Sequence, residues 1–304
     1  MLDNILEFFY ILCGIMMLYT AYAALTNKTN PARIGTALFW GITGIIFVIG
    51  HFIPYSITGI LLLALGVISV LNKVKVGKLD EPAPEFRRKA ADKIGNKIFI
   101  PAIVLAVAAF VIAQWSGLGG LIGIGIASVI GLVVAIFITK APIKYSAIDS
   151  DRLLQQVGPS AILPQILAAL GIVFTLAGVG DVISHIISRI IPEGNLLCGT
   201  IAYCVGMFVF TIVMGNAFAA FAVITAGIGF PFVIAQGADP AIAGALALTA
   251  GYCGTLITPM AANFNIVPAA LLETENKNQV IIAQFPIAII LLLVHIVLMY
   301  FWAF

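Results

Sequence analysis

Two clusters of small and neutral polar residues interrupt the apolar C-terminal half of the chain. The first is the Gly-Asn pair at residues 215–216, which lies between two apolar runs of nearly twenty residues each. The second is CGTLITPMAA at residues 253–262, with an asparagine directly after it. Hydroxyl and carbonyl oxygens can coordinate a cation in a medium of low dielectric constant, and backbone amides can face a carboxylate. The candidate substrate- or ion-binding residues are therefore Gly215, Asn216, Gly254, Thr255, Thr258, Pro259 and Asn263.

The first cluster predicts a helical hairpin over residues 196–235. Both flanks are apolar and long enough to form helices, whereas a Gly-Asn pair favours a turn, so the tip is expected at Met214–Ala217. The chain returns to the same side of the membrane whether the arms cross it fully or form a re-entrant hairpin, and the sequence leaves these two alternatives open.

The second cluster predicts a broken span over residues 240–272. A membrane crossing needs roughly 20 apolar residues, and the helical runs at 240–252 and 263–272 are each too short to cross alone. Pro259 cannot donate a backbone hydrogen bond, and it disfavours helix at Thr258. Non-helical backbone at membrane depth is tolerated only where it lines a cavity or is buried in protein. Each interruption alone could be an ordinary helix kink, but two adjacent ones, with Asn265 adding a further polar group, favour a site.

The composition identifies the solvent as lipid. The chain is 62% hydrophobic and 9% charged, with a mean hydropathy of +1.15, whereas a soluble globular chain is about 25% charged. The apolar runs are continuous and do not alternate, which excludes a β-barrel and predicts an all-α polytopic membrane protein. A net charge of +2 gives no reason to expect nucleic acid as a partner.

The apolar runs predict about eight spans, one of them broken, plus the hairpin. Residues 1–138 form a scaffold of five spans with a basic cytoplasmic loop at 72–97, and residues 139–159 form a cytoplasmic linker. Residues 160–304 hold a span at 160–178, an amphipathic helix at 181–191, the hairpin, the broken span and a final span at 280–302. This arrangement places fourteen of the fifteen basic residues in the cytoplasm, Arg189 being the exception, and puts both termini outside.

The segment 181–191 reads DVISHIISRII and is too short to span. Its polar residues share one face, which predicts a helix lying in the outer membrane interface. Asp181 and His185 could alternatively form a proton relay or a metal pair, but a solvated face explains all five polar residues and a metal site would need a third ligand.

Small residues recur at every fourth position from Gly119 to Gly131. Such a stripe allows close approach of another helix, either within this chain or on a partner.

The C-terminal residues carry a resemblance. The order of span, interfacial helix, hairpin, broken span and final span resembles the repeat of the ion-transporter superfamily, which includes divalent-anion/sodium symporters and arsenite-type carriers. The stretch GTLITPMAANFN matches the superfamily's broken span through five of the candidates, from Gly254 to Asn263. The Ser-Asn-Thr hairpin tip of the symporters corresponds here to MGNA, so only Asn216 matches by type. Full carriers hold two inverted repeats, but residues 1–138 show no second interrupted pair.

A single repeat resembles the larger membrane subunit of two-subunit 5-oxoproline (pyroglutamate) transporters, long catalogued as a domain of unknown function. This resemblance implies a secondary active transporter of a small carboxylate, 5-oxoproline, in the cell (inner) membrane. A smaller membrane subunit would supply the complementary repeat. It implies no resident cofactor; Na⁺ or H⁺ would be the coupling ion, and the scarcity of intramembrane carboxylates favours Na⁺. The alternatives are a non-transporting structural or regulatory subunit, and a membrane-embedded enzyme, for which the spans offer no paired carboxylates or HExxH motif.

Overall fold

The computed structural model describes residues 2–78, 84–189 and 194–304 and confirms the predicted fold class. The described chain is all-α, with 81% of its residues in helices and no strand. Part of the predicted basic loop 72–97 (residues 79–83) and the last two residues of the predicted amphipathic helix 181–191 lie outside the described residues.

Eight helices in the described ranges are long and apolar enough to cross a membrane, so the chain is a multi-pass membrane protein. The set differs in detail from the eight predicted spans. The eight helices include both arms of the hairpin. They do not include the apolar helix Tyr55–Val70 or the two halves of the broken span, which are shorter than a full crossing. The positions of the termini relative to the membrane remain predictions.

The chain divides into two compact units, Met1–Gly158 and Pro159–Phe304. The helices of the first unit are α1 (Leu2–Thr26), α2 (Arg33–Ile49), α3 (Tyr55–Val70), α4 (Pro84–Ile94), α5 (Ile100–Trp115), α6 (Gly120–Thr139) and α7 (Ile143–Val157). Its main pairs are α1 with α2 and α5 with α6. Helix α4 lies within the predicted basic loop, and α7 within the predicted linker. Both are amphipathic, so the polar residues of the predicted loop and linker belong in part to helices with one apolar face.

The small-residue stripe of α6 packs inside the first unit. A Cβ at Gly123 would lie 3.3 Å from the backbone nitrogen of Ala113, and one at Gly131 would lie 3.2 Å from the Cβ of Leu105. Both neighbours belong to α5, so these glycines bring α5 and α6 together. The sequence left open whether the stripe contacts a helix of this chain or of a partner; at Gly123 and Gly131 the contact is with a helix of this chain.

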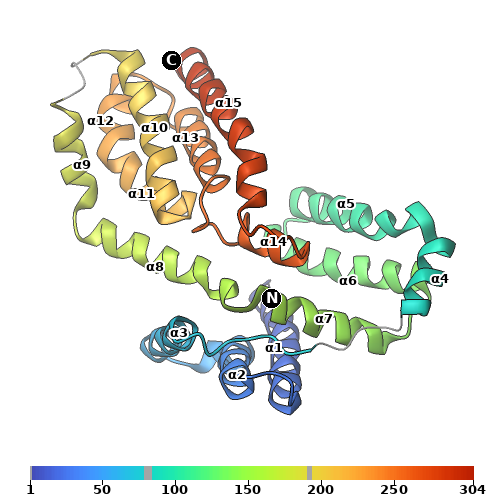
Figure 1. Cartoon of the computed structure of the whole chain (residues 1–304). Coiled ribbons are helices and arrows are strands. Elements are labelled where there is room, and N and C mark those ends of the chain that lie inside the picture. The colour runs from blue at the N-terminus through green and yellow to red at the C-terminus, as the bar shows by residue number, and fades with distance from the viewer. Residues whose placement is uncertain (1, 79–83, 190–193) are drawn as a thin grey trace. The chain divides into compact units, whose positions relative to one another are not determined.

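The second unit contains the predicted hairpin and broken span. Its helices are α8 (Leu163–Leu176), α9 (Val179–Ile187), α10 (Leu196–Met214), α11 (Ala217–Ile224), α12 (Phe230–Phe232), α13 (Pro240–Thr255), α14 (Ile266–Leu271) and α15 (Gln279–Trp302). Helices α10, α11, α13 and α15 lie side by side (Figure 1) and share one buried core. Tyr203, Met207 and Ala250 are fully buried in it. Because this core holds α10 and α13 together, it fixes the two interruptions relative to each other.

The second hairpin arm contains a π-helical turn at Thr225–Gly229 that the sequence did not predict. The Tyr203 hydroxyl lies 2.8 Å from the Thr225 hydroxyl. A Cβ at Gly227 would lie 2.5 Å from the carbonyl oxygen of Gly180, so α9 contacts the hairpin at this turn. Single π-turns within α-helices are frequent at functional sites.

Candidate functional site

The hairpin tip is built from two complementary caps. Gly215 has a φ of +67°, a left-handed conformation that ends α10, and its N–H donates to the carbonyl of Thr211 at 2.6 Å. Asn216 caps the start of α11, and its Oδ1 accepts hydrogen bonds from the backbone N–H groups of Phe218 (2.9 Å) and Ala219 (3.3 Å). The Gly-Asn pair therefore forms a turn at the predicted position because each residue satisfies the helix end beside it.

The break in the second element is held by one buried asparagine. Helix α13 continues to Thr255 and α14 begins only at Ile266, with turns between them. Asn265 is fully buried, and its Nδ2 donates to the carbonyls of Thr255 and Thr258, at 2.7 Å in each case. The bond to Thr255 replaces the helical partner that Pro259, four residues later, cannot supply, as buried backbone requires. The Thr258 carbonyl also accepts from the N–H of Ala261, at 3.3 Å. The Oδ1 of the same side chain is buried and accepts no hydrogen bond in the described structure.

The tip and the break lie against each other. A Cβ on Gly215 would lie 2.6 Å from the carbonyl carbon and oxygen of Met260, so only glycine allows this approach. The Thr258 hydroxyl donates to the carbonyl of Ile212 in the last turns of α10, at 2.8 Å. Two segments 46 residues apart in the chain, measured from Ile212 to Thr258, thus form one structure.

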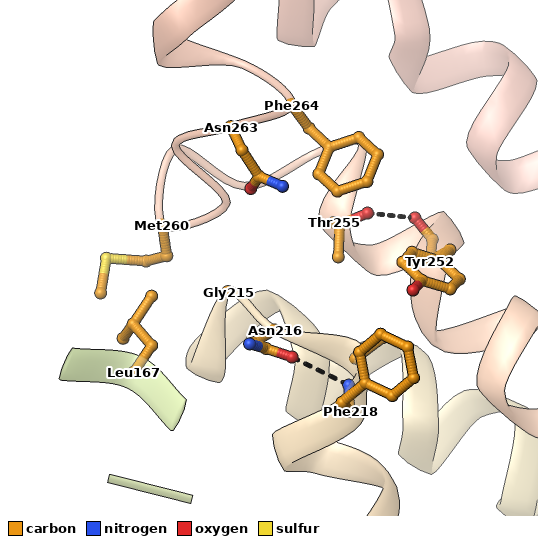
Figure 2. A pocket seen from close by; sticks show the side chains of 10 residues that line it. Leu167, Gly215, Asn216, Phe218, Tyr252, Thr255, Met260, Asn263 and Phe264 are labelled. Atoms are coloured by element: carbon orange, nitrogen blue, oxygen red, sulfur yellow. Dashed lines mark hydrogen bonds between the residues drawn. The ribbon is translucent and has the colours of Figure 1, made fainter. Parts of the chain in front are cut away.

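A cavity of about 160 Å³ lies at this junction (Figure 2). Its lining contains four of the seven candidates, Gly215, Asn216, Thr255 and Asn263. Its other lining residues are Leu167, Ala217, Phe218, Tyr252, Met260 and Phe264. None of these ten side chains carries a formal charge at neutral pH, so the cavity offers neutral polar groups beside apolar walls.

Three candidates lie outside this lining. Gly254 faces α10, where a Cβ would overlap the carbonyl of Phe208, so its role is helix packing. Thr258 is buried, and its hydroxyl bonds to Ile212. Pro259 is exposed on the loop. Gly254 and Thr255 also belong to α13, which extends three residues beyond the predicted helical run.

Aromatic side chains form a part of the lining that the sequence reasoning missed. The ring of Tyr252 lies 6.0 Å from that of Phe218, edge to face, and 6.0 Å from that of Phe264. These three come from different segments, so no spacing in the sequence relates them. Asn265 was noted as a nearby polar residue only, and nothing in its spacing distinguishes it from Asn263 before the fold is known.

The polar atoms of the cavity differ in what they can still bind. The Thr255 hydroxyl donates its proton to the carbonyl of Tyr252 at 2.6 Å and keeps its lone pairs for a cation (Figure 2). The Oδ1 of Asn216 is used by the α11 cap, whereas its Nδ2 donates no hydrogen bond within the described part of the chain. An amide nitrogen can donate to a carboxylate. The junction can therefore contact a cation and an anionic group through different residues.

Comparisons with known proteins identify the family and give no relative of known function. No curated protein matches the chain, and no solved structure does. The model of one protein family, described as "Protein of unknown function (DUF979)", matches residues 7–304. Because this match covers almost the entire sequence, the chain belongs to the DUF979 family.

Proposed function

We propose that this chain is one subunit of a cation-coupled secondary transporter for a small carboxylate, with 5-oxoproline as the substrate to test first. The observation that carries the proposal is the contact between the hairpin tip and the broken span around one neutral polar cavity. A broken helix in a membrane exposes backbone groups whose desolvation costs free energy. Such a break is expected where those groups bind a transported solute or ion.

Two uncharged oxygens support Na⁺ as the coupled ion. Thr255 lines the cavity, and its hydroxyl oxygen keeps its lone pairs while it donates to Tyr252. Asn265 is not among the lining residues, but it bonds to the carbonyl of Thr255, and its own Oδ1 is buried without a hydrogen bond in the described structure. A buried acceptor of this kind costs about 1–3 kcal/mol unless something occupies it. A cation bound nearby would offset that cost. Proton coupling is the alternative, and it would use groups on the partner subunit.

The partner is inferred from the surface around the cavity. Phe218 is 64% exposed and Met260 is 40% exposed, although both line the cavity. Exposed apolar side chains can face lipid, but the polar groups of the cavity cannot, so a second polypeptide that covers both would complete the wall. A smaller membrane subunit with its own hairpin and broken span would provide that wall and the rest of the ligands.

The alternative of a purely structural subunit gains no specific support. Such a subunit could use the α6 stripe as its assembly surface, but Gly123 and Gly131 pack against α5. Transport thus remains the function that accounts for the junction.

The test is uptake by proteoliposomes that contain the chain alone, the partner alone, or both. We expect uptake of labelled 5-oxoproline only with both subunits, and stimulation by an inward Na⁺ gradient. Full uptake by either chain alone would contradict a divided site. Uptake driven by a proton gradient without Na⁺ would assign the coupling to H⁺. Failure of 5-oxoproline and of other small carboxylates to enter, with both subunits folded and associated, would overturn the proposal.

A further inference from the structure

A second and larger cavity lies in the first unit, between α4 and α7. Its volume is about 390 Å³, which is within the range of small-molecule sites. One wall is Ala90, Ala91, Ile94, Gly95 and Ile98, from α4 and the short 3₁₀ turn after it. The opposite wall includes Tyr145, Asp149 and Arg152. These three are spaced i, i+4 and i+7 and therefore share one face of α7.

The cavity lies at one end of the α5–α6 pair. Thr139, which lines it, is the last residue of α6, and Ile98 lies just before the start of α5. Because both helices are continuous apolar helices, their ends mark the boundary between hydrocarbon and headgroups. The cavity is therefore at headgroup depth whichever side of the membrane it faces.

The two segments that border the cavity contain more basic than acidic residues. The segments 90–98 and 139–152 contain Lys93, Lys97, Lys140, Lys144 and Arg152, against Asp92, Asp149 and Asp151. Arg152 pairs with Asp149 (Nε to Oδ1, 3.4 Å), and 25% of its side chain stays exposed. Lys97, Lys140 and Lys144 are exposed and adjoin lining residues in the sequence. This combination of a basic edge and an aliphatic wall is complementary to an amphiphile with an anionic head.

We propose that this cavity binds an anionic phospholipid of the surrounding bilayer. Its phosphodiester would lie beside Arg152 and Tyr145, because a guanidinium and a phenol are donors for phosphate oxygens. Its first acyl methylenes would lie along Ile94 and Ile98, where they replace water on apolar surface. Basic pockets at the ends of membrane helices are suited to such headgroups. The site is independent of the transport site, since every lining residue belongs to the first unit.

The experiment is native mass spectrometry of the purified full-length chain in mixed micelles with phosphatidylglycerol or phosphatidylcholine. We expect the wild type to retain phosphatidylglycerol preferentially. Arg152→Gln should lower that retention about fivefold, the effect of one basic residue at an anionic lipid surface. Ile94→Trp should abolish it by filling the cavity. Lys277→Gln, which removes an exposed basic residue in the other unit, should change nothing.

Four outcomes would overturn the proposal. Wild-type retention of phosphatidylglycerol in folded Ile94→Trp would show that the lipid binds elsewhere. If Arg152→Gln does not fold, Ile94→Trp and Lys144→Gln take its place in the experiment. Equal retention of both lipids would exclude recognition of the charge. Displacement by millimolar inorganic phosphate would assign a soluble anion, and displacement by the partner subunit would assign a polypeptide.

Discussion

Gly215 is the residue through which the hairpin tip contacts the broken span, so Gly215→Ala is the sharpest test of their packing. Its φ of +67° is unfavourable for alanine by about 1–2 kcal/mol. The new Cβ would also lie 2.6 Å from the backbone of Met260, and displacing packed backbone costs about 1–3 kcal/mol. The free energy of unfolding should therefore fall by about 2–5 kcal/mol, measured by thermal or denaturant unfolding in detergent.

Gly178→Ala separates the two contributions. Gly178 has a similar φ of +72°, but a Cβ there would meet only the Asp181 carboxylate oxygen, at an ordinary 3.5 Å. This control should show the conformational cost alone and remain clearly more stable than Gly215→Ala. Equal unfolding transitions for the two variants would refute the contact between tip and break.

Two further substitutions test the elements that hold the site. Asn265→Ala should lower the unfolding free energy by about 1–3 kcal/mol, as measured by the same unfolding assay, because it leaves the buried carbonyl of Thr255 unpaired, whereas that of Thr258 keeps its bond from Ala261. Gly227→Ala should separate α9 from the π-helical turn, because its Cβ would lie 2.5 Å from the carbonyl oxygen of Gly180, and should speed amide hydrogen exchange in both segments.

Matched controls exist for both. Asn276→Ala removes an exposed asparagine whose Oδ1 accepts only a local bond from the Asn278 N–H, and it should have little effect. Gly59→Ala places a Cβ in open space within α3 and should not destabilise the chain. A loss of stability in Asn265→Ala no larger than in Asn276→Ala would contradict the role given to Asn265. Unchanged exchange in Gly227→Ala would contradict the packing at the π-turn.

The helical architecture could be predicted from the sequence because lipid leaves the backbone few alternatives. Long apolar runs must form helices to satisfy their own N–H and C=O groups. The positions of the tip and the break were predictable for a similarly local reason. Gly215 and Asn216 have the conformational and capping preferences of a helix end and a helix start, and Pro259 cannot continue a helix.

The use of each polar group could not be predicted, because it depends on partners distant in the sequence. The Thr258 hydroxyl bonds to Ile212, 46 residues earlier, and Gly254 leaves room for the carbonyl of Phe208, which a Cβ would overlap. In the sequence, Thr258 looks equivalent to Thr255, which does line the cavity, and nothing marks Gly254 as a packing residue. The π-helical turn could not be predicted from the sequence for the same reason. It coincides with contacts to Tyr203 and Gly180, which no local pattern encodes.

The central claim is that the junction of tip and break is one half of a transport site, and Thr255→Val tests it most directly. The substitution removes the hydroxyl of a residue that lines the cavity, whereas Thr249→Val removes one from the exposed face of the same helix. Both hydroxyls bond to carbonyls of their own helix, so the effects on stability should be similar and small. In proteoliposomes with the partner subunit, we expect Thr255→Val to raise the Na⁺ concentration for half-maximal uptake at least about tenfold, the loss of one ligand to a charged group. Thr249→Val should leave it unchanged. Identical Na⁺ dependence and uptake in the two variants would contradict the assignment of the site.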